Sequence, residues 1–343
     1  MFAFRSYGLV ALPATALMVA LGVAGGTESV AAGTAPRAAS GAEASAPDGL
    51  IPLATLREAT LTIPAWPVED AEFCASGPVK FSKGKADLVR LVGAVLHTDI
   101  DHDGAKETVV QVSCNPQWED RQVLVFDRNA SGKIITLGRL AHTGAGVEGR
   151  DIMKIWSIKP GEAGDVQVDV GDYRPCCTQA QDSPQHQWRT FGMREGKFRQ
   201  TDGPTAFGPN PKVTDLAVTA GRPQVTPKPG GGWTTTVTVD IHNRGRFAVG
   251  HTGLLVMGTG TLVGANGWEQ CENKPTGDPD EATARCVFPA VAPGASMRHT
   301  LGFTSAGKPT GTLSLWVESV NTNGHQYPDS DVEDNNIEAP LAA

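Results

Sequence analysis

An acidic loop between two apolar stretches holds the residues of this sequence that are best suited to chemistry. Its pattern is Asp99-x-Asp101-x-Asp103-Gly104-x-x-Glu107. Alternating carboxylates direct their oxygens toward one point when a glycine lets the loop turn sharply, and several hard oxygen ligands suit calcium. The predicted ligands are four carboxylates and one backbone carbonyl, at Asp99, Asp101, Asp103, Ala105 and Glu107.

The residues on either side of this loop read as strands, which excludes an EF-hand. That motif needs two helices and a Glu at its twelfth position, where this chain has Val110. The loop resembles the calcium loops of integrin-type (FG-GAP) propeller repeats, although Glu107 stands where those repeats have Asp. Magnesium fits less well because it gives up its water reluctantly. The alternative is a metal-free turn that uses Asp and Gly as turns generally do.

Signatures of catalysis are missing from the sequence. It contains no nucleophile elbow, no H-E-x-x-H motif and no P-loop, and its eight histidines are scattered. Gly144-x-Gly146-x-x-Gly149 matches the dinucleotide fingerprint by letter. Residues 151–156 that follow read as a strand, whereas the fingerprint must open a helix, so we expect a loop there.

The seven tryptophans are the other candidates for ligand contact. Trp156, Trp188 and Trp316 lie within strand patterns, and we expect them in the core. Trp118 and Trp268 lie in polar segments. A large aromatic ring in such a segment is a candidate for stacking on a ligand, so these two are the predicted contacts.

The first 32 residues have the features of a secretory signal peptide. Arg5 precedes an apolar run over residues 9–23, and the small residues of 29–32 follow it. The alternative is a membrane anchor, but the run is shorter than the ~20 residues that a span needs. We therefore expect a protein that is secreted, extracellular or associated with the cell wall, with no membrane insertion after cleavage. A net charge of −8 without a basic patch argues against nucleic acid as a partner.

An even number of cysteines in an exported chain indicates disulfides rather than metal ligands. Cys271 and Cys286 lie in the same half of the chain, and we predict that they pair. Adjacent cysteines rarely bond to each other. Each of Cys74 and Cys114 is therefore predicted to bond to one of the neighbours Cys176 and Cys177, in an order that the sequence leaves open.

The composition divides the rest of the chain into four parts. Residues 33–49 are rich in Ala, Ser, Gly and Pro and predict a disordered linker. Residues 50–203 alternate short strand patterns with turn signals, among them hairpin turns at 129–132, 159–161 and 195–197, which predicts an antiparallel meander, either a curled sheet or a partial propeller. A Pro- and Gly-rich break at 204–212 separates it from residues 213–343, whose strand spacing predicts a β-sandwich. The predicted fold class is therefore all-β.

The C-terminal half contains the segments DLAV at 215–218, VTVDIHNRG at 237–245, CVFPAVAPGASMRHTLGF at 286–303 and DVEDNN at 331–336. With these segments it resembles the bacterial surface immunoglobulin-like (CARDB-like) repeats. The resemblance implies an immunoglobulin-like β-sandwich. Such repeats serve as spacers, as adhesins and as accessories of carbohydrate-active enzymes, so the fold alone implies no single function.

The N-terminal half contains the segments VLHTDIDHDGAKETVVQVSC at 95–114, VFDRNASGKI at 125–134, DYRPCC at 172–177 and QHQWRTF at 185–191. With these segments it resembles a domain of secreted actinobacterial proteins. That family implies no particular activity, so the resemblance assigns no catalytic residue.

The sequence therefore favours a secreted, non-catalytic binding or adhesion protein whose partner is an extracellular protein or a polysaccharide. The alternatives are a secreted hydrolase, an accessory module of a carbohydrate-active enzyme and a purely structural spacer. A pocket with perturbed carboxylates would favour an enzyme, whereas exposed aromatic side chains on a rigid sheet would favour a binding protein.

Overall fold

The computed structural model describes residues 50–68, 71–116, 118–144, 152–258, 260–262, 271–273 and 284–341. The predicted signal peptide and linker, most of the Gly144–Gly149 motif and Trp268 lie outside the described residues. Among those described, the structure is almost entirely β, as predicted, with one four-residue α-helix. No helix in these ranges is long and apolar enough to cross a membrane.

The N-terminal half consists of short strands and two helical turns. They are α1 (Leu53–Leu56), β1 (Thr60–Ile63), η1 (Ala71–Phe73), β2 (Gly77–Lys80), β3 (Lys85–Ala86), β4 (Val89–Thr98), β5 (Glu107–Cys114), β6 (Asp120–Arg128), β7 (Ile134–His142), β8 (Lys154–Pro160), β9 (Val166–Gly171), β10 (His186–Arg194) and β11 (Lys197–Asp202).

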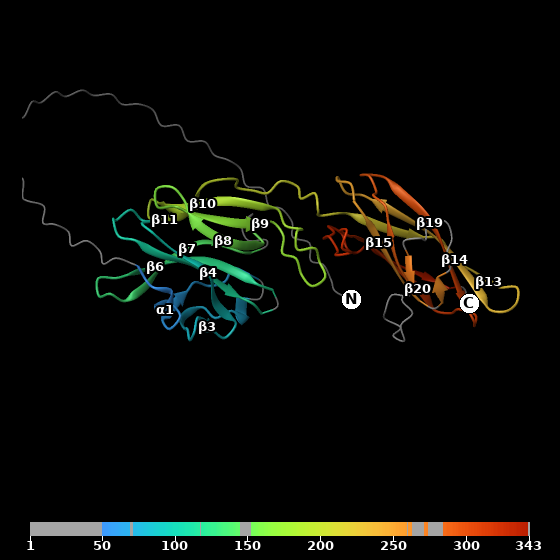
Figure 1. Ribbon diagram of the computed structural model, residues 1–343, viewed down its shortest axis with the longest axis horizontal. Helices are drawn as coiled ribbons and strands as arrows, with labels where there is room; N and C mark the ends of the chain where they lie inside the picture. The colour runs from blue at the N-terminus through green and yellow to red at the C-terminus, as the bar shows by residue number, and fades with distance from the viewer. Residues whose placement is uncertain are drawn as a thin grey trace, which may run out of the picture. The chain divides into compact units, whose positions relative to one another are not determined.

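The predicted antiparallel meander is confirmed. Strands β3 to β7 form one sheet in chain order, and strands β8 to β11 form a second sheet, also in chain order. β1 and β2 make a small third sheet (Figure 1). Sequential pairing needs only short turns, which is why Asn-, Gly- and Pro-rich segments between alternating strands predicted this topology well.

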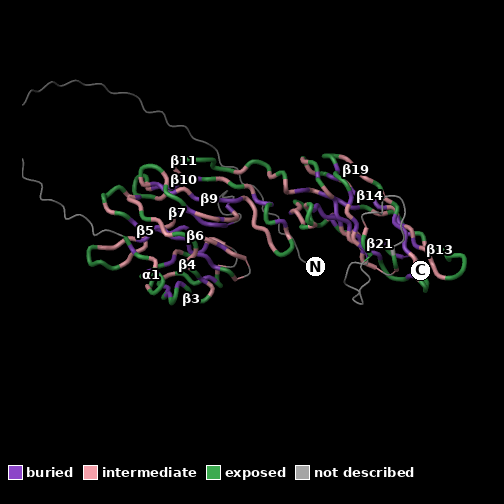
Figure 2. Tube along the Cα trace, in the orientation of Figure 1, coloured by how far each residue is buried: buried purple, intermediate pink, exposed green. Residues whose placement is uncertain are grey.

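The core of this half lies on both sides of β5, all of whose residues are buried. Because successive side chains of a strand point to opposite faces, Val109 packs toward the β8–β10 sheet with Val168. Val110 packs toward Leu56 and Phe81 around α1 and the β1–β2 sheet. The burial colouring shows this central position of β5 and β6 (Figure 2). The sheet is therefore covered on both faces and makes a rigid support.

Two of the predicted hairpin turns lie where they were expected. Asn129–Gly132 connects β6 and β7, and the backbone N–H of Gly132 donates to the carbonyl of Asn129 at 2.7 Å. Glu195 and Gly196 connect β10 and β11 with φ values of 54° and 69°, as a two-residue hairpin of this twist requires. The third turn lies later than predicted, because β8 continues to Pro160 and the chain reverses over Gly161–Asp165.

The C-terminal half is made of strands alone within the described ranges. They are β12 (Leu216–Ala220), β13 (Gln224–Pro227), β14 (Trp233–Asn243), β15 (Thr252–Met257), β16 (Thr261–Leu262), β17 (Cys271–Asn273), β18 (Ala284–Phe288), β19 (Ser296–Ser305), β20 (Thr312–Ser319) and β21 (Asn336–Pro340).

These strands form two five-stranded sheets. One has the order β12-β14-β19-β16 with β13 added to β14, and the other has the order β17-β18-β15-β20-β21. A single apolar core, which includes Val239, Leu254 and Leu315, contains residues of both sheets, as in a β-sandwich. The finer assignment to the immunoglobulin-like class stays a prediction. So does the domain boundary at 204–212, since residues Ser45–Ala343 form one compact unit.

The acidic tail segment, residues 331–336, links the two sheets of this sandwich. The carbonyl of Asp334 accepts a hydrogen bond from Val218 on β12, and that of Asn335 accepts one from Val317 on β20. β21 then pairs with β20 along its length. The tail is thus an integral part of the sandwich.

The disulfides confirm one predicted pairing and correct the other two. Cys271 and Cys286 are bonded, as predicted, and lie opposite each other on β17 and β18. The prediction for the remaining four was wrong, because Cys74 bonds to Cys114 and Cys176 bonds to Cys177. Cys74 is buried after η1 beside the end of β5, so Cys114 lies within disulfide reach, with a Cα–Cα distance of 5.9 Å. Cys177 has a φ of 56°, a conformation that the sequence did not reveal.

Candidate functional site

The acidic loop connects β4 to β5, which pair up to Thr98 and Glu107. Its turns are made by its own side chains. Asp101 Oδ1 accepts a hydrogen bond from the N–H of Asp103 at 3.2 Å, and Asp103 Oδ1 accepts one from the N–H of Ala105 at 2.8 Å. Short Asp side chains favour this kind of local turn. The loop is thus shaped by the same residues that the sequence singled out.

Three of the four predicted carboxylates come together. Asp99, Asp101 and Glu107 each place an oxygen within 4.8 Å of the others. The structure does not bring Asp103 into this group. Asp99 Oδ1 is buried and has no hydrogen-bond partner among the described residues. An oxygen-only set with an orphaned buried carboxylate oxygen fits a hard cation such as calcium.

Burial and mutual repulsion make Glu107 and Asp101 hard to ionise. Burial, together with the negative charges of Asp101 and Asp127, raises the pKa of Glu107 to about 7. The hydrogen bond from the N–H of Ile100 to Glu107 opposes this only in part. Burial also raises the pKa of Asp101. The hydrogen bond from the N–H of Asp103 opposes this shift, and the negative charges of Asp103 and Asp99 add to it. A bound cation would remove both costs.

The turn between β8 and β9 packs directly on the acidic loop. Thr98 Oγ1 donates to the carbonyl of Gly164 at 2.8 Å. A Cβ added to Gly164 would lie 2.0 Å from the carbonyl oxygen of Asp99. The second sheet therefore holds the first end of the loop in place. No local sequence pattern predicted this contact.

A separate pocket of about 310 Å³ lies where the end of β5, the start of β6 and the start of β8 meet the 172–177 segment. Its walls combine cations, one carboxylate, an indole and a disulfide. The lining residues on which the argument rests are Trp118, Glu119, Arg121, Lys154, Arg174 and the bonded pair Cys176–Cys177. Of these, sequence reasoning proposed only Trp118 as a ligand contact.

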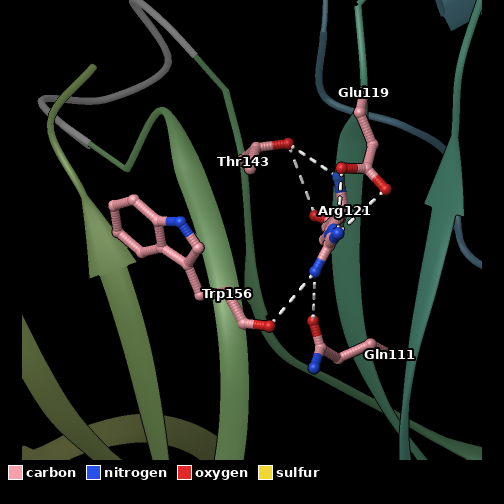
Figure 3. A network of polar contacts seen from close by, with 5 residues as sticks. All are labelled: Gln111, Glu119, Arg121, Thr143 and Trp156. Carbon is pink, nitrogen blue, oxygen red and sulfur yellow. Dashed lines mark hydrogen bonds and ion pairs between the residues drawn. The ribbon is translucent and has the colours of Figure 1, made fainter. Parts of the chain in front are cut away.

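Arg121 lines the pocket and is held by a network of hydrogen bonds, which Figure 3 shows. Its Nη2 donates to both carboxylate oxygens of Glu119, at 3.0 and 2.9 Å. Its Nη1 donates to Gln111 Oε1 at 3.1 Å and to the carbonyl of Trp156 at 3.2 Å. The backbone N–H of Arg121 donates to Thr143 Oγ1 at 2.9 Å. One side chain therefore ties β5 and β6 to β8 across the two sheets.

Arg174 forms another wall of the pocket. Its Nη1 donates to Asp120 Oδ1 at 2.7 Å, and Thr143 Oγ1 donates to the same oxygen at 2.9 Å. The guanidinium carbon of Arg174 lies 5.6 Å from the centre of the Trp118 ring. The cation thus holds the indole as well as the buried carboxylate, which positions Trp118 for contact with a ligand.

Lys154 is the third cation of the pocket. Burial lowers the pKa of this ammonium group, and the charge of Glu119 opposes that shift. Its Nζ lies 5.5 Å from the ring centre of Trp156. No carboxylate in the described ranges lies within ion-pair distance of it. The pocket therefore contains a half-buried positive charge that the described residues neutralise only weakly.

The strand tryptophans are more exposed than the sequence predicted. Trp188 is 39% exposed, and the Nζ of Lys159 lies 3.8 Å from its ring centre. Trp156 is half-buried and stacks on His186, with the ring centres 3.7 Å apart. Trp316 is also half-buried. The core prediction was wrong for Trp188 because the outer face of the β8–β11 sheet carries no further layer in the described part of the chain.

Comparison with models of known protein families finds no match for this chain, and comparison with curated protein sequences finds none either. The function is therefore inferred from the geometry of the acidic loop and the pocket. Glu107, whose pKa is raised to about 7, lies in the acidic loop, and the carboxylate of the pocket, Glu119, is held in two hydrogen bonds by Arg121. This arrangement suits holding a ligand more than proton transfer.

Proposed function

We propose that this protein is an exported, non-catalytic binding protein of the extracellular space or cell envelope. In this proposal the pocket around Trp118 holds the ligand. The observation that carries the proposal is the make-up of that pocket, in which fixed cationic donors and an indole surround a carboxylate that is already paired with Arg121. Such a site offers hydrogen bonds and a stacking surface but no acid–base pair.

Calcium in the acidic loop is the second part of the proposal. Asp99, Asp101 and Glu107 would hold the ion, and Asp103 and the carbonyl of Ala105 remain predicted further ligands. Bound calcium would supply positive charge to buried carboxylates and would tie the end of β4 to the start of β5. Its role here is to stabilise the loop.

The remaining features agree with a role outside the cytoplasm. All six cysteines lie in disulfides, which persist in oxidising compartments. The C-terminal sandwich, in its predicted immunoglobulin-like form, would act as a stalk or adhesion unit. Its two sheets and its bonded tail make a compact body of the kind that such units need.

The test is retention of the mature protein on cell-wall fractions and on polysaccharides, measured in calcium and in chelator. We expect retention on one class of material, and a loss of retention in Trp118→Ala. Trp188→Ala is the matched control, since Trp188 is an exposed tryptophan outside the pocket. If no extracellular material retains the protein under either condition, the proposed function is wrong.

A further inference from the structure

The charges of the pocket are unequally compensated. Arg121 is paired with Glu119 at 2.9 Å, and Arg174 is paired with Asp120 at 2.7 Å. Lys154 has no carboxylate partner in the part of the chain that the structure describes. Counting these five side chains gives three positive and two negative charges, so the pocket has an excess positive charge at Lys154.

This excess charge would be compensated by an anionic ligand. A half-buried ammonium group loses part of its hydration, and an anion that enters the pocket restores the lost interactions. Arg174 can contribute as well, because a guanidinium has five N–H donors and the pair with Asp120 involves Nη1. Two cationic donors on neighbouring walls suit a carboxylate, which has two oxygens to accept them.

Other parts of the pocket wall offer an aromatic ring and a disulfide. The Trp118 indole offers a ring face, and the Cys176–Cys177 disulfide offers soft, polarisable sulfur. Gln179 holds the disulfide segment in place, since its Oε1 accepts from the N–H of Cys176 at 2.8 Å and from the hydroxyl of Tyr173 at 3.1 Å. Rigid apolar faces of this kind suit the C–H face of a sugar ring.

We infer that the pocket binds a carboxylate-bearing sugar residue, with its carboxylate at Lys154 and Arg174 and its ring against Trp118. The inference rests on the proposed function and specifies its ligand class. The volume of about 310 Å³ is at the lower end of the roughly 300–1,000 Å³ of ligand pockets, so one sugar ring fits better than a longer segment. The recognised unit is therefore a terminal or branching residue of an acidic polysaccharide.

The test is calorimetric titration of the mature protein with uronic acid oligosaccharides, with their neutral hexose counterparts and with inorganic sulfate. We expect the uronic acid ligand to bind at least about tenfold more tightly than the neutral sugar and than sulfate, because hydrogen bonds to charged groups are stronger than those between neutral groups. This comparison uses the unmodified protein and does not depend on any variant folding.

Two pairs of variants assign the contacts. Lys154→Gln should weaken uronic acid binding at least about tenfold, whereas Lys159→Gln should leave it unchanged. Lys159 lies on the same strand, β8, and its Nζ sits over the Trp188 ring outside the pocket. Trp118→Ala should weaken binding of the acidic sugar, and Trp188→Ala should not.

Three results would overturn the inference. They are equal binding of acidic and neutral sugars, sulfate binding as tight as uronic acid binding, and equal effects of Lys154→Gln and Lys159→Gln. If a cell-wall fraction retains the protein but no uronic acid ligand binds, the ligand class is wrong and the proposed function stands. If nothing is retained and no sugar binds, both are wrong.

Discussion

Glu107 Oε2 accepts a hydrogen bond from the backbone N–H of Ile100 at 2.8 Å, so the first residue of β5 is bonded back to the start of the acidic loop. Both residues are buried, and Asp99, next to Ile100, has an orphaned carboxylate oxygen. The loop is therefore a closed structure before any ion binds. What still destabilises the loop is the repulsion between its closely spaced carboxylates, which a bound cation can relieve.

Calcium should stabilise the mature protein by this route. Extracellular calcium sites usually bind in the ~0.1–1 mM range, so about 1 mM free calcium should add roughly 0.4–1.4 kcal/mol to the free energy of unfolding. The melting temperature should rise modestly in calcium, return to its starting value in chelator, and respond much less to magnesium. Asp101→Asn should abolish the rise.

Asp202→Asn is the control for this change, because it removes one negative charge from an exposed position outside the loop. It should leave the calcium effect intact. Asp103→Asn distinguishes two ligand sets. The set predicted from the sequence includes Asp103, whereas the structure brings Asp99, Asp101 and Glu107 together without it. Calorimetry that detects no calcium binding up to several millimolar would refute the metal site.

The three disulfides should differ widely in their effect on stability. Cys74–Cys114 closes a separation of 40 residues and should contribute roughly 4 kcal/mol, and Cys271–Cys286 closes 15 residues and should contribute roughly 3 kcal/mol. Cys176–Cys177 spans adjacent residues and restricts almost none of the unfolded chain. Replacing each pair by serines and measuring urea denaturation tests this order. Peptide mapping that links Cys74 to residue 176 or 177 would contradict the pairing on which this order rests.

The sequence predicted the acidic loop well because the loop is local. Its predicted ligand residues lie within nine positions, and hydrogen bonds of its own Asp side chains shape its turns. Asp103 shows the limit of that reasoning. Its carboxylate satisfies the N–H of Ala105 instead of joining the cluster, a choice that depends on backbone geometry.

The pocket could not be predicted in the same way because its residues come from three distant segments. Trp118, Lys154 and Cys177 meet only when the second sheet packs on the first. Trp118 was the one lining residue that the sequence singled out, because a tryptophan in a polar segment is unusual. The Cys176–Cys177 neighbours were a usable signal that was misread, since a positive φ at the second cysteine lets the two bond to each other.

Gly164→Ala should destabilise the protein more than an ordinary glycine replacement in a turn. Gly164 has a φ of +85°, and an added Cβ would lie 2.0 Å from the carbonyl oxygen of Asp99. The backbone conformation alone costs roughly 1–2 kcal/mol for a residue with a side chain, and the clash brings the expected loss to roughly 3 kcal/mol or more.

Gly132→Ala separates the two causes of that loss. Gly132 has a φ of +75° but no atom within 4 Å of an added Cβ, so it should show the backbone cost alone. Urea denaturation of both variants gives the comparison. Equal losses would mean that the β8–β9 turn does not press on the acidic loop.

The stability of the C-terminal sandwich should fall in mild acid because of His299. Its ring stacks on Phe288, with the centres 3.9 Å apart, and burial lowers the pKa of His299 below its ordinary value of about 6.5. Below that pH the unfolded chain binds a proton that the folded chain does not bind. The contribution is therefore complete above about pH 6.5 and is lost as the pH falls toward the lowered pKa.

Urea denaturation at about pH 7 and about pH 5 should show this loss, and His299→Phe should reduce it while keeping an aromatic ring against Phe288. His325→Gln, which changes an exposed turn histidine of the same half, should leave the loss unchanged. An unaltered pH dependence in His299→Phe would mean that this histidine titrates alike in the folded and unfolded chains.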